Sequence, residues 1–117
     1  EGLSHSEVVS PVSVPPDCVR SPFFHTIQVN TARISVPKKL FAEAVRAEGI
    51  AVNPDYRYVL AEWPWLQKYF KHPATAHNAA RFRDTSFNLL FHEAFTDADA
   101  QDIVDSILKV ESAYFLD

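Results

Sequence analysis

Gly49 is the only glycine beyond the second residue of this 117-residue chain, and it marks the end of a helix. The residues before it place apolar side chains on one helical face, namely Leu40, Phe41, Ala44 and Val45. Pro37 suits the first turn of that helix, because the N–H that proline lacks would have no helical partner there. A glycine after the last turn tolerates the left-handed backbone with which many helices end. We therefore predict a helix from about Pro37 to Gly49.

A short strand and a polar turn follow this glycine. Ile50–Val52 is apolar and partly β-branched, which favours a buried strand, and Pro54 ends it because proline cannot donate to a sheet ladder. The turn Asn53–Tyr56 places polar side chains at a strand end, where loops often carry ligand contacts. An ordinary solvated turn would have the same pattern, so both interpretations stay open.

The composition limits the classes of protein to which the chain can belong. A length of 117 residues with 47% hydrophobic residues predicts one domain with a substantial core. The net charge of −4, with scattered Lys and Arg, provides no basic footprint for nucleic acid. No apolar run reaches the roughly 20 residues of a membrane span, and no signal peptide is visible. Cys18 is the only cysteine, which excludes an internal disulfide and indicates the cytoplasm.

Strand patterns occur on both sides of the predicted helix. Residues 1–22 hold half of the eight prolines and little periodicity, so we expect a leader or interdomain segment before a domain at 23–117. Phe23–Val29 alternates aromatic and β-branched residues and is the strongest strand pattern. Ser86–Glu93 alternates more loosely and predicts another strand.

Three further helices are expected. Pro64 is compatible with the first turn of a short helix over about 62–71. Thr75 can cap a helix that continues to about Asp84. Thr96 precedes acids in a first turn, which suits the helix dipole, and a long apolar stripe follows. Together with the strands, these helices predict an α+β domain.

The residue types of a complete active site are not visible. Two glycines in the whole chain exclude a phosphate-binding glycine loop. The histidines lack zinc spacing, and no motif pairs a nucleophile with a base. We therefore expect no metal ligands and no catalytic residue in this chain. The aromatic segment Trp63–Phe70 favours a core or interface over a cofactor stack.

The order and spacing of several segments resemble the C-terminal small domain of DegT/StrS-type sugar aminotransferases, which are PLP-dependent enzymes of aspartate aminotransferase fold. These segments are LFAEAVRAEGI with the turn that ends at Tyr56, Asn78–Phe82, Asn88–Glu93 and Thr96–Val110. The resemblance covers about residues 12–115. Asp55 stands where the family often has His, and Leu90 where it often has Pro. The resemblance implies a small, mostly antiparallel sheet of about three strands, packed by about four helices.

The resemblance also implies site residues and a cofactor. It implies substrate contacts from Asn53, Asp55, Tyr56 and His92. Pyridoxal 5′-phosphate is implied for the full-length enzyme, with none bound to this chain alone, because the family's Schiff-base lysine lies in an N-terminal large domain. The lysines of this chain occur in helical settings that we expect to be exposed: Lys38, Lys39, Lys68, Lys71 and Lys109. The chain has no methionine, so we expect a piece of a longer or processed protein.

Two functions from different classes follow. In the first, the chain closes and shapes the substrate pocket of an aminotransferase and does not catalyse alone. The complete enzyme, a homodimer by resemblance, would pass an amino group from a donor to a keto sugar, usually nucleotide-linked, or to a keto cyclitol. In the second, the chain is a stand-alone binding or protein-interaction module that uses the Trp63–Phe70 aromatic patch. Neither function involves nucleic acid or a membrane.

Overall fold

An antiparallel sheet of four short strands, in the order β1-β2-β4-β3, forms the centre of the fold. The computed structural model describes residues 2–117. The strands are β1 (Val9–Pro11), β2 (His25–Val29), β3 (Val52–Asn53) and β4 (Ser86–Leu89). The α+β class and the antiparallel sheet are confirmed, and the sheet has one strand more than expected. That strand, β1, lies within residues 1–22, so the domain boundary at residue 22 stays a prediction.

The strands are shorter than their sequence patterns suggested. β2 begins at His25, not Phe23, and β4 ends at Leu89, before His92 and Glu93. β3 is shifted to Val52–Asn53, and Pro54 follows it directly as expected. The paired register of β2 and β4 runs from His25 with Leu89 to Gln28 with Ser86, so Phe23, Phe24, His92 and Glu93 lie outside it despite their strand-like pattern.

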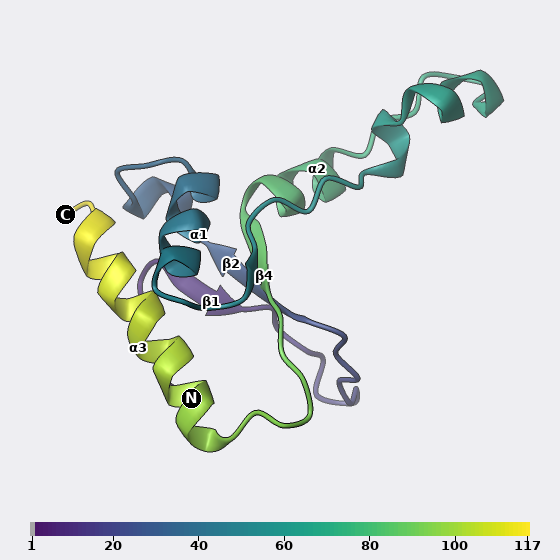
Figure 1. The fold of residues 1–117 in the computed structure, drawn as a ribbon. Helices are drawn as coiled ribbons and strands as arrows, with labels where there is room; N and C mark the ends of the chain where they lie inside the picture. Colours follow the sequence, from purple (N-terminus) through teal and green to yellow (C-terminus); the bar gives the residue numbers. More distant parts are fainter. Residues whose placement is uncertain (1) are drawn as a thin grey trace.

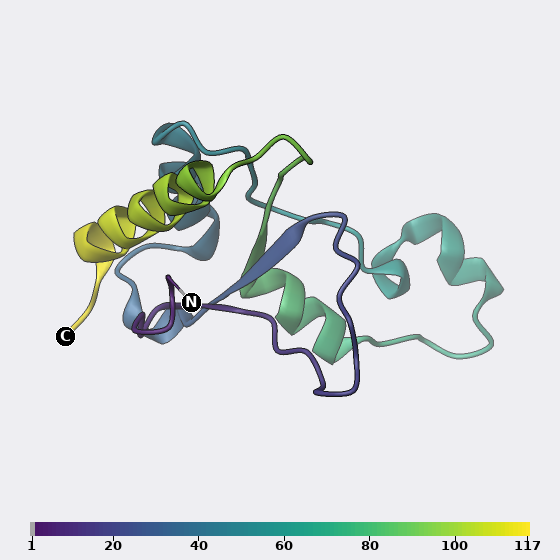
Figure 2. The ribbon, with the colours of Figure 1, turned by 90° about the horizontal axis from the view of Figure 1, so that it is seen from below.

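Two helices cover one face of the sheet (Figure 2), α1 (Lys38–Ala47) and α3 (Asp97–Tyr114). Side-chain alternation along β2 and β4 turns the apolar residues toward these helices. Fully buried Phe41 and Ile107 from the helices meet Phe87 and Ile27 from the strands in a single core. Val8 and Val9 belong to the same core, which explains why the proline-rich N-terminal segment contributes a strand.

The end of α1 follows the glycine prediction. Gly49 has a φ of 96°, and its N–H donates to the carbonyl oxygen of Arg46 at 3.0 Å. Apart from its two chain neighbours, no described residue has an atom within 4 Å of the position that a Cβ would occupy. The backbone conformation, and not crowding, therefore requires glycine here.

The start of α3 also follows its prediction. The N–H of Asp99 donates to Oγ1 of Thr96 at 3.3 Å, and the N–H of Thr96 donates to Oδ2 of Asp99 at 2.7 Å. These reciprocal bonds form a capping box, which satisfies two backbone donors at the helix start. Hydrogen bonding from Thr96 lowers the pKa of Asp99.

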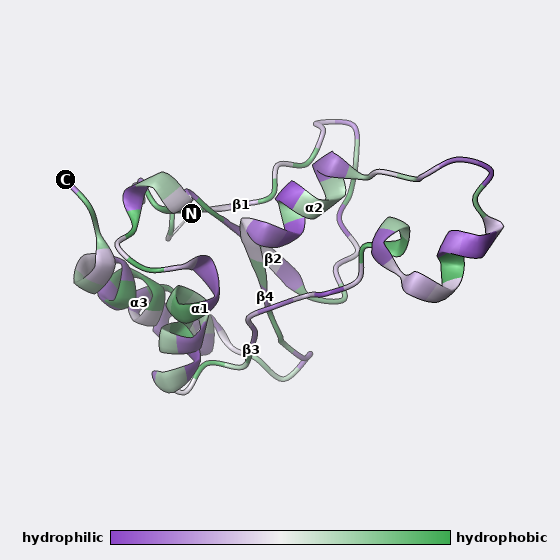
Figure 3. Cartoon of the chain, turned by 90° about the horizontal axis from the view of Figure 1, so that it is seen from above, coloured by the Kyte–Doolittle hydropathy of each residue, from purple (hydrophilic) through white to green (hydrophobic). Residues whose placement is uncertain are grey.

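The helix α2 (His77–Asp84) lies on the other side of the strands from α1 and α3, as Figure 3 shows. Its position agrees with the prediction, but Thr75 does not cap it. Ala76 occupies the N-cap position and makes no side-chain hydrogen bond. Thr75 therefore stands one residue too early for its hydroxyl to act as the cap.

Residues 57–76 form an arm that extends away from the sheet (Figure 1). The helix expected over 62–71 is replaced by two short 3₁₀ helices, η2 (Leu60–Glu62) and η3 (Pro64–Tyr69). Trp63, between them, has an extended backbone with ψ of 120°. The cause is Pro64, because the proline ring disfavours the helical region for the residue before it.

Candidate functional site

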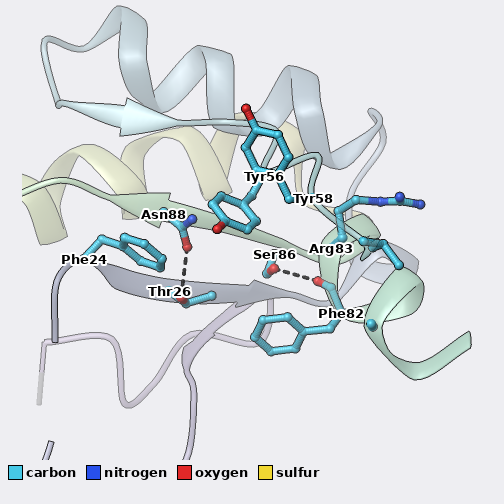
Figure 4. A pocket seen from close by; sticks show the side chains of 10 residues that line it. Phe24, Thr26, Tyr56, Tyr58, Phe82, Arg83, Ser86 and Asn88 are labelled. Atoms are coloured by element: carbon cyan, nitrogen blue, oxygen red, sulfur yellow. Dashed lines mark hydrogen bonds between the residues drawn. The ribbon is translucent and has the colours of Figure 1, made fainter. Parts of the chain in front are cut away.

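A pocket of about 220 Å³ opens on the sheet face turned away from α1 and α3 (Figure 4). Its walls are largely aromatic. Phe24 precedes β2, Tyr56 and Tyr58 follow β3, and Phe82 comes from α2. Phe24 and Tyr56 have ring centroids 6.0 Å apart, and Tyr56 meets Tyr58 edge to face at 5.4 Å. Three parts of the chain that are distant in sequence therefore meet to form one aromatic enclosure.

Polar side chains from the sheet form the floor of this pocket. Thr26 of β2 and Asn88 of β4 are directly paired in register, and Oγ1 of Thr26 donates to Oδ1 of Asn88 at 2.9 Å. The hydroxyl of Ser86 donates to the carbonyl oxygen of Phe82 at 2.6 Å. Asn88 and Ser86 are buried, so the floor is polar but shielded from bulk water.

Arg83 lines the same pocket, but its charge is already compensated. Its guanidinium donates to Asp84 at 2.8 Å and also pairs with Glu62 of the arm. These two hydrogen bonds raise the pKa of Arg83, with Asp84 contributing most, and the bond from Arg83 lowers the pKa of Asp84. Arg83 therefore joins α2 to the arm and does not present a free cation.

The turn predicted to carry ligand contacts is held by a buried lysine. Nζ of Lys38, the first residue of α1, donates to the carbonyl oxygen of Pro54 at 2.9 Å and lies 3.7 Å from Oδ1 of Asp55. The expectation that all five lysines are exposed is wrong for Lys38, which is 7% exposed. The polar groups of the turn compensate its burial. Burial lowers the pKa of Lys38, and the nearby carboxylates of Asp55 and Asp84 oppose that shift.

The structure brings some of the predicted site residues together. Tyr56 is a wall of the pocket. Asn53 is the ladder partner of Asn88, and its Oδ1 accepts the N–H of Asp55 at 3.2 Å. Asp55 lies between Lys38 and Arg57, each 3.7 Å away. Asn53 and Asp55 thus shape the turn that carries Tyr56.

His92 lies outside this group. It is exposed beyond the end of β4, its ring centroid is 4.5 Å from that of Phe95, and its Nδ1 accepts the N–H of Ala94 at 3.2 Å. It is not among the residues that line the pocket. A substrate contact from His92 stays a prediction, as do the contacts from Asn53, Asp55 and Tyr56.

The floor residues Asn88 and Thr26 were missed by the sequence interpretation. One signal was present, because Asn88 interrupts the apolar run from Phe87 to Leu90 with a side chain that needs hydrogen-bond partners. The pairing with Thr26 spans 62 residues of sequence, so no local pattern could have shown it.

Comparison with known proteins gives fold similarity without close sequence similarity. No family model matches the sequence, and no curated protein matches it significantly. A putative sugar aminotransferase, Spr1654 from Streptococcus pneumoniae in its PMP form, matches with a TM-score of 0.74 at 18% identity. The aminotransferase TlmJ from Streptoalloteichus hindustanus matches at 0.70 and 17%. PseC from Helicobacter pylori, an aminotransferase involved in the biosynthesis of pseudoaminic acid, matches at 0.70 and 16%.

The chain has the fold of one domain of such enzymes. Each match covers 96% of this chain but only 28 or 29% of the aminotransferase chain. The matching part is the small domain of the aminotransferase fold, which agrees with the expected fold class. Identities below 20% establish the fold and leave the activity to be argued from the site.

Among residues 2–117, no lysine lines the aromatic pocket. Lys38 is engaged by Pro54 and Asp55 and does not line the pocket, while Lys39, Lys68, Lys71 and Lys109 are exposed. A Schiff-base lysine must instead be partly desolvated beside the cofactor. Within residues 2–117, no cluster of His, Cys, Asp or Glu could hold a metal ion. Over the same residues, no helix is long and apolar enough to cross a membrane.

Proposed function

We propose that this chain is the C-terminal small domain of a DegT/StrS-type, PLP-dependent sugar aminotransferase. One observation carries the proposal: three aminotransferases, one of them described as a putative sugar aminotransferase, contain nearly the whole of this fold in just over a quarter of their length. The ordered segments around LFAEAVRAEGI and Thr96–Val110 support it independently. The cofactor and the Schiff-base lysine would belong to a large domain outside these 117 residues.

In this proposal the domain shapes the substrate pocket and does not catalyse alone. Active sites often lie between domains, and the aromatic pocket provides one wall of such a site. Aromatic faces suit the C–H surfaces of a sugar ring, and the neutral floor of Thr26 and Asn88 suits its hydroxyl groups. Tyr56 would contact substrate directly. Asn53 and Asp55 would hold the turn that carries it, and His92 would contact substrate from outside the pocket.

The acceptor in the complete enzyme would be a keto sugar, most simply nucleotide-linked, or a keto cyclitol, with glutamate or glutamine as the amino donor. The complete enzyme would be a cytoplasmic homodimer. Residues 1–22 would include the interdomain segment, from which β1 joins the sheet of the small domain.

The coding frame upstream of Glu1 tests this proposal directly. Sequencing the source DNA should show a continuous frame for a large domain with a Schiff-base lysine. The protein expressed from that complete frame should transfer an amino group to a keto sugar, and residues 1–117 alone should not. A stop codon closely upstream, or transamination by the 117-residue chain, would overturn the proposal.

A second candidate function is a stand-alone interaction module. The observation that favours it is the arm, on which Trp65 is 59% and Tyr69 is 67% exposed. Exposed aromatic clusters mark interaction surfaces more often than inert ones. An initiator methionine near Glu1 would favour this function.

A further inference from the structure

We propose that the pocket binds an uncharged ring with an acceptor oxygen, and that Asn88 selects this ring through its side-chain amide. Asn88 is not among the residues that the sequence suggested as substrate contacts. The identification of the ring as part of a keto-sugar substrate rests on the proposed function, whereas the chemistry of the pocket does not.

The first argument is the hydrogen bonding of Asn88. The side chain is 4% exposed, and its Oδ1 is occupied by the hydroxyl of Thr26. Its Nδ2 has no hydrogen-bond partner among residues 2–117. Every fully buried side-chain N or O atom in that range does have a partner, so Nδ2 is not fully buried. Nδ2 must therefore be reached from the pocket that Asn88 lines. Figure 4 shows the amide nitrogen on the side away from the Thr26 hydrogen bond.

The second argument is the fixed orientation of this amide. The Thr26 hydroxyl holds Oδ1, so the amide group is fixed in its plane and Nδ2 keeps its N–H donors on the other side of the group. A buried donor that is already oriented contributes to selectivity, because a ligand without an acceptor leaves the donor unpaired on binding. The ligand must therefore place an acceptor oxygen at the floor.

The third argument is the size and the wall chemistry. A pocket of about 220 Å³ is smaller than the 300 Å³ or more typical of drug-sized ligands, so it admits a single ring. Phe24, Tyr56 and Tyr58 present aromatic surfaces at centroid separations of 5.4 to 6.0 Å around that space. Such surfaces favour stacking with the flat face of a ring.

The fourth argument is charge. Among residues 2–117, Arg83 is the only formally charged side chain that lines the pocket, and Asp84 and Glu62 both compensate it. An anionic ligand would therefore enter a shielded site without a free cation, at a high desolvation cost. The ring, and not a phosphate group, is the part of a ligand that fits here.

A sugar ring and a nucleobase share this chemistry, and three probes distinguish them. We would titrate the ¹⁵N-labelled 117-residue chain separately with methyl α-D-glucopyranoside, uridine and inorganic phosphate, and follow the side-chain amide signals of Asn88 by NMR. We expect one of the two ring probes to shift these signals saturably at millimolar concentration, and phosphate to leave them unchanged. Shifts from phosphate, or from neither ring probe, would overturn the inference.

The variant Asn88→Asp tests the donor itself. The carboxylate keeps the shape of the amide and can still accept from Thr26, but it replaces the N–H donors by an acceptor. We expect the ring probe to bind about tenfold more weakly, followed in this variant by the backbone amide signals of Thr26 and Tyr56, which also line the pocket. The matched control is Asn78→Asp, the same chemical change on the exposed surface of α2, which should leave the affinity unchanged.

A second variant keeps the test informative if Asn88→Asp does not fold. Asn88→Leu removes the donor without introducing a buried charge and should weaken binding by a similar factor. Wild-type affinity in a folded Asn88 variant would refute the inference. This test is independent of the test of the proposed function, because probe binding is measured with the 117-residue chain, whereas the upstream coding frame is determined by sequencing DNA. If a ring probe binds but the upstream frame encodes no large domain, the proposed function is refuted and the inference about the pocket is not.

Discussion

The ammonium of Lys38 donates a hydrogen bond of 2.9 Å to the carbonyl oxygen of Pro54, and so joins the first turn of α1 to the end of β3. The two residues are 16 positions apart, with the rest of α1 and all of β3 between them. Since Tyr56 follows Pro54 by two residues, this bond fixes the turn that places an aromatic wall of the pocket. A buried lysine thus has a structural explanation without any covalent role.

Replacing Lys38 by methionine should destabilise the chain. The substitution leaves the carbonyl of Pro54 without its donor, which costs about 1–3 kcal/mol. Lys39→Met is the matched control, because Lys39 is exposed in the same helical turn, and its effect should stay within about 0.5 kcal/mol. Urea unfolding measures both free energies. Equal stability of the two variants would show that the Lys38 contact contributes nothing.

The pH dependence of stability should reveal the lowered pKa of Lys38. Burial lowers this pKa below the ordinary 10.5, so between the folded-state pKa and 10.5 the unfolded chain binds more protons than the folded chain. Stability should therefore rise with pH through that alkaline window. The free energy of unfolding of the wild type minus that of Lys38→Met isolates this group from the other titrating residues. A difference that falls as pH rises would contradict the assignment.

The two threonines expected to cap helices should behave differently. Thr96→Ala removes a hydroxyl that accepts the N–H of Asp99 and should cost about 1 kcal/mol. Thr75→Ala should change stability by less than about 0.5 kcal/mol, because Ala76 and not Thr75 stands at the start of α2. Thermal unfolding of the pair measures the difference. A loss for Thr96→Ala as small as that expected for Thr75→Ala would show that the capping box does not stabilise α3.

Gly49→Ala should destabilise the end of α1 through the backbone alone. An alanine at φ of 96° is strained by about 1–2 kcal/mol, although no neighbour lies within 4 Å of its Cβ. Gly49→Asn should cost less, because asparagine tolerates positive φ better than alanine. Chemical denaturation of both variants tests the order. An alanine variant as stable as the asparagine variant would mean that the backbone relaxes.

These residues show which features the sequence could predict. Gly49 and Thr96 act within one turn of their own helix, and so their roles follow from local rules. The inward face of β2 was also predictable, because alternation along a strand places Ile27 and Thr26 on opposite faces of the sheet.

The missed features depend on contacts across the fold. Lys38 has the sequence context of an exposed helical lysine, and only the turn at Pro54 makes its burial possible. Asn88 has a role because Thr26 holds its amide from another strand. Sequence periodicity carries no information on such pairs, and so the pocket floor could not be assigned before the structure.

The exposed aromatics of the arm provide the last prediction. The double substitution of Trp65 and Tyr69 by serine should leave the unfolding free energy of the chain within about 0.5 kcal/mol, since both side chains are largely exposed. If the arm instead packs on a further domain in the complete protein, the same change should destabilise that protein relative to its wild type. Unfolding of the 117-residue chain and of the full frame, measured in parallel, separates the two contributions. A large loss in the 117-residue chain would show that the arm is part of its core, and the interaction-module function would then lose its free aromatic surface.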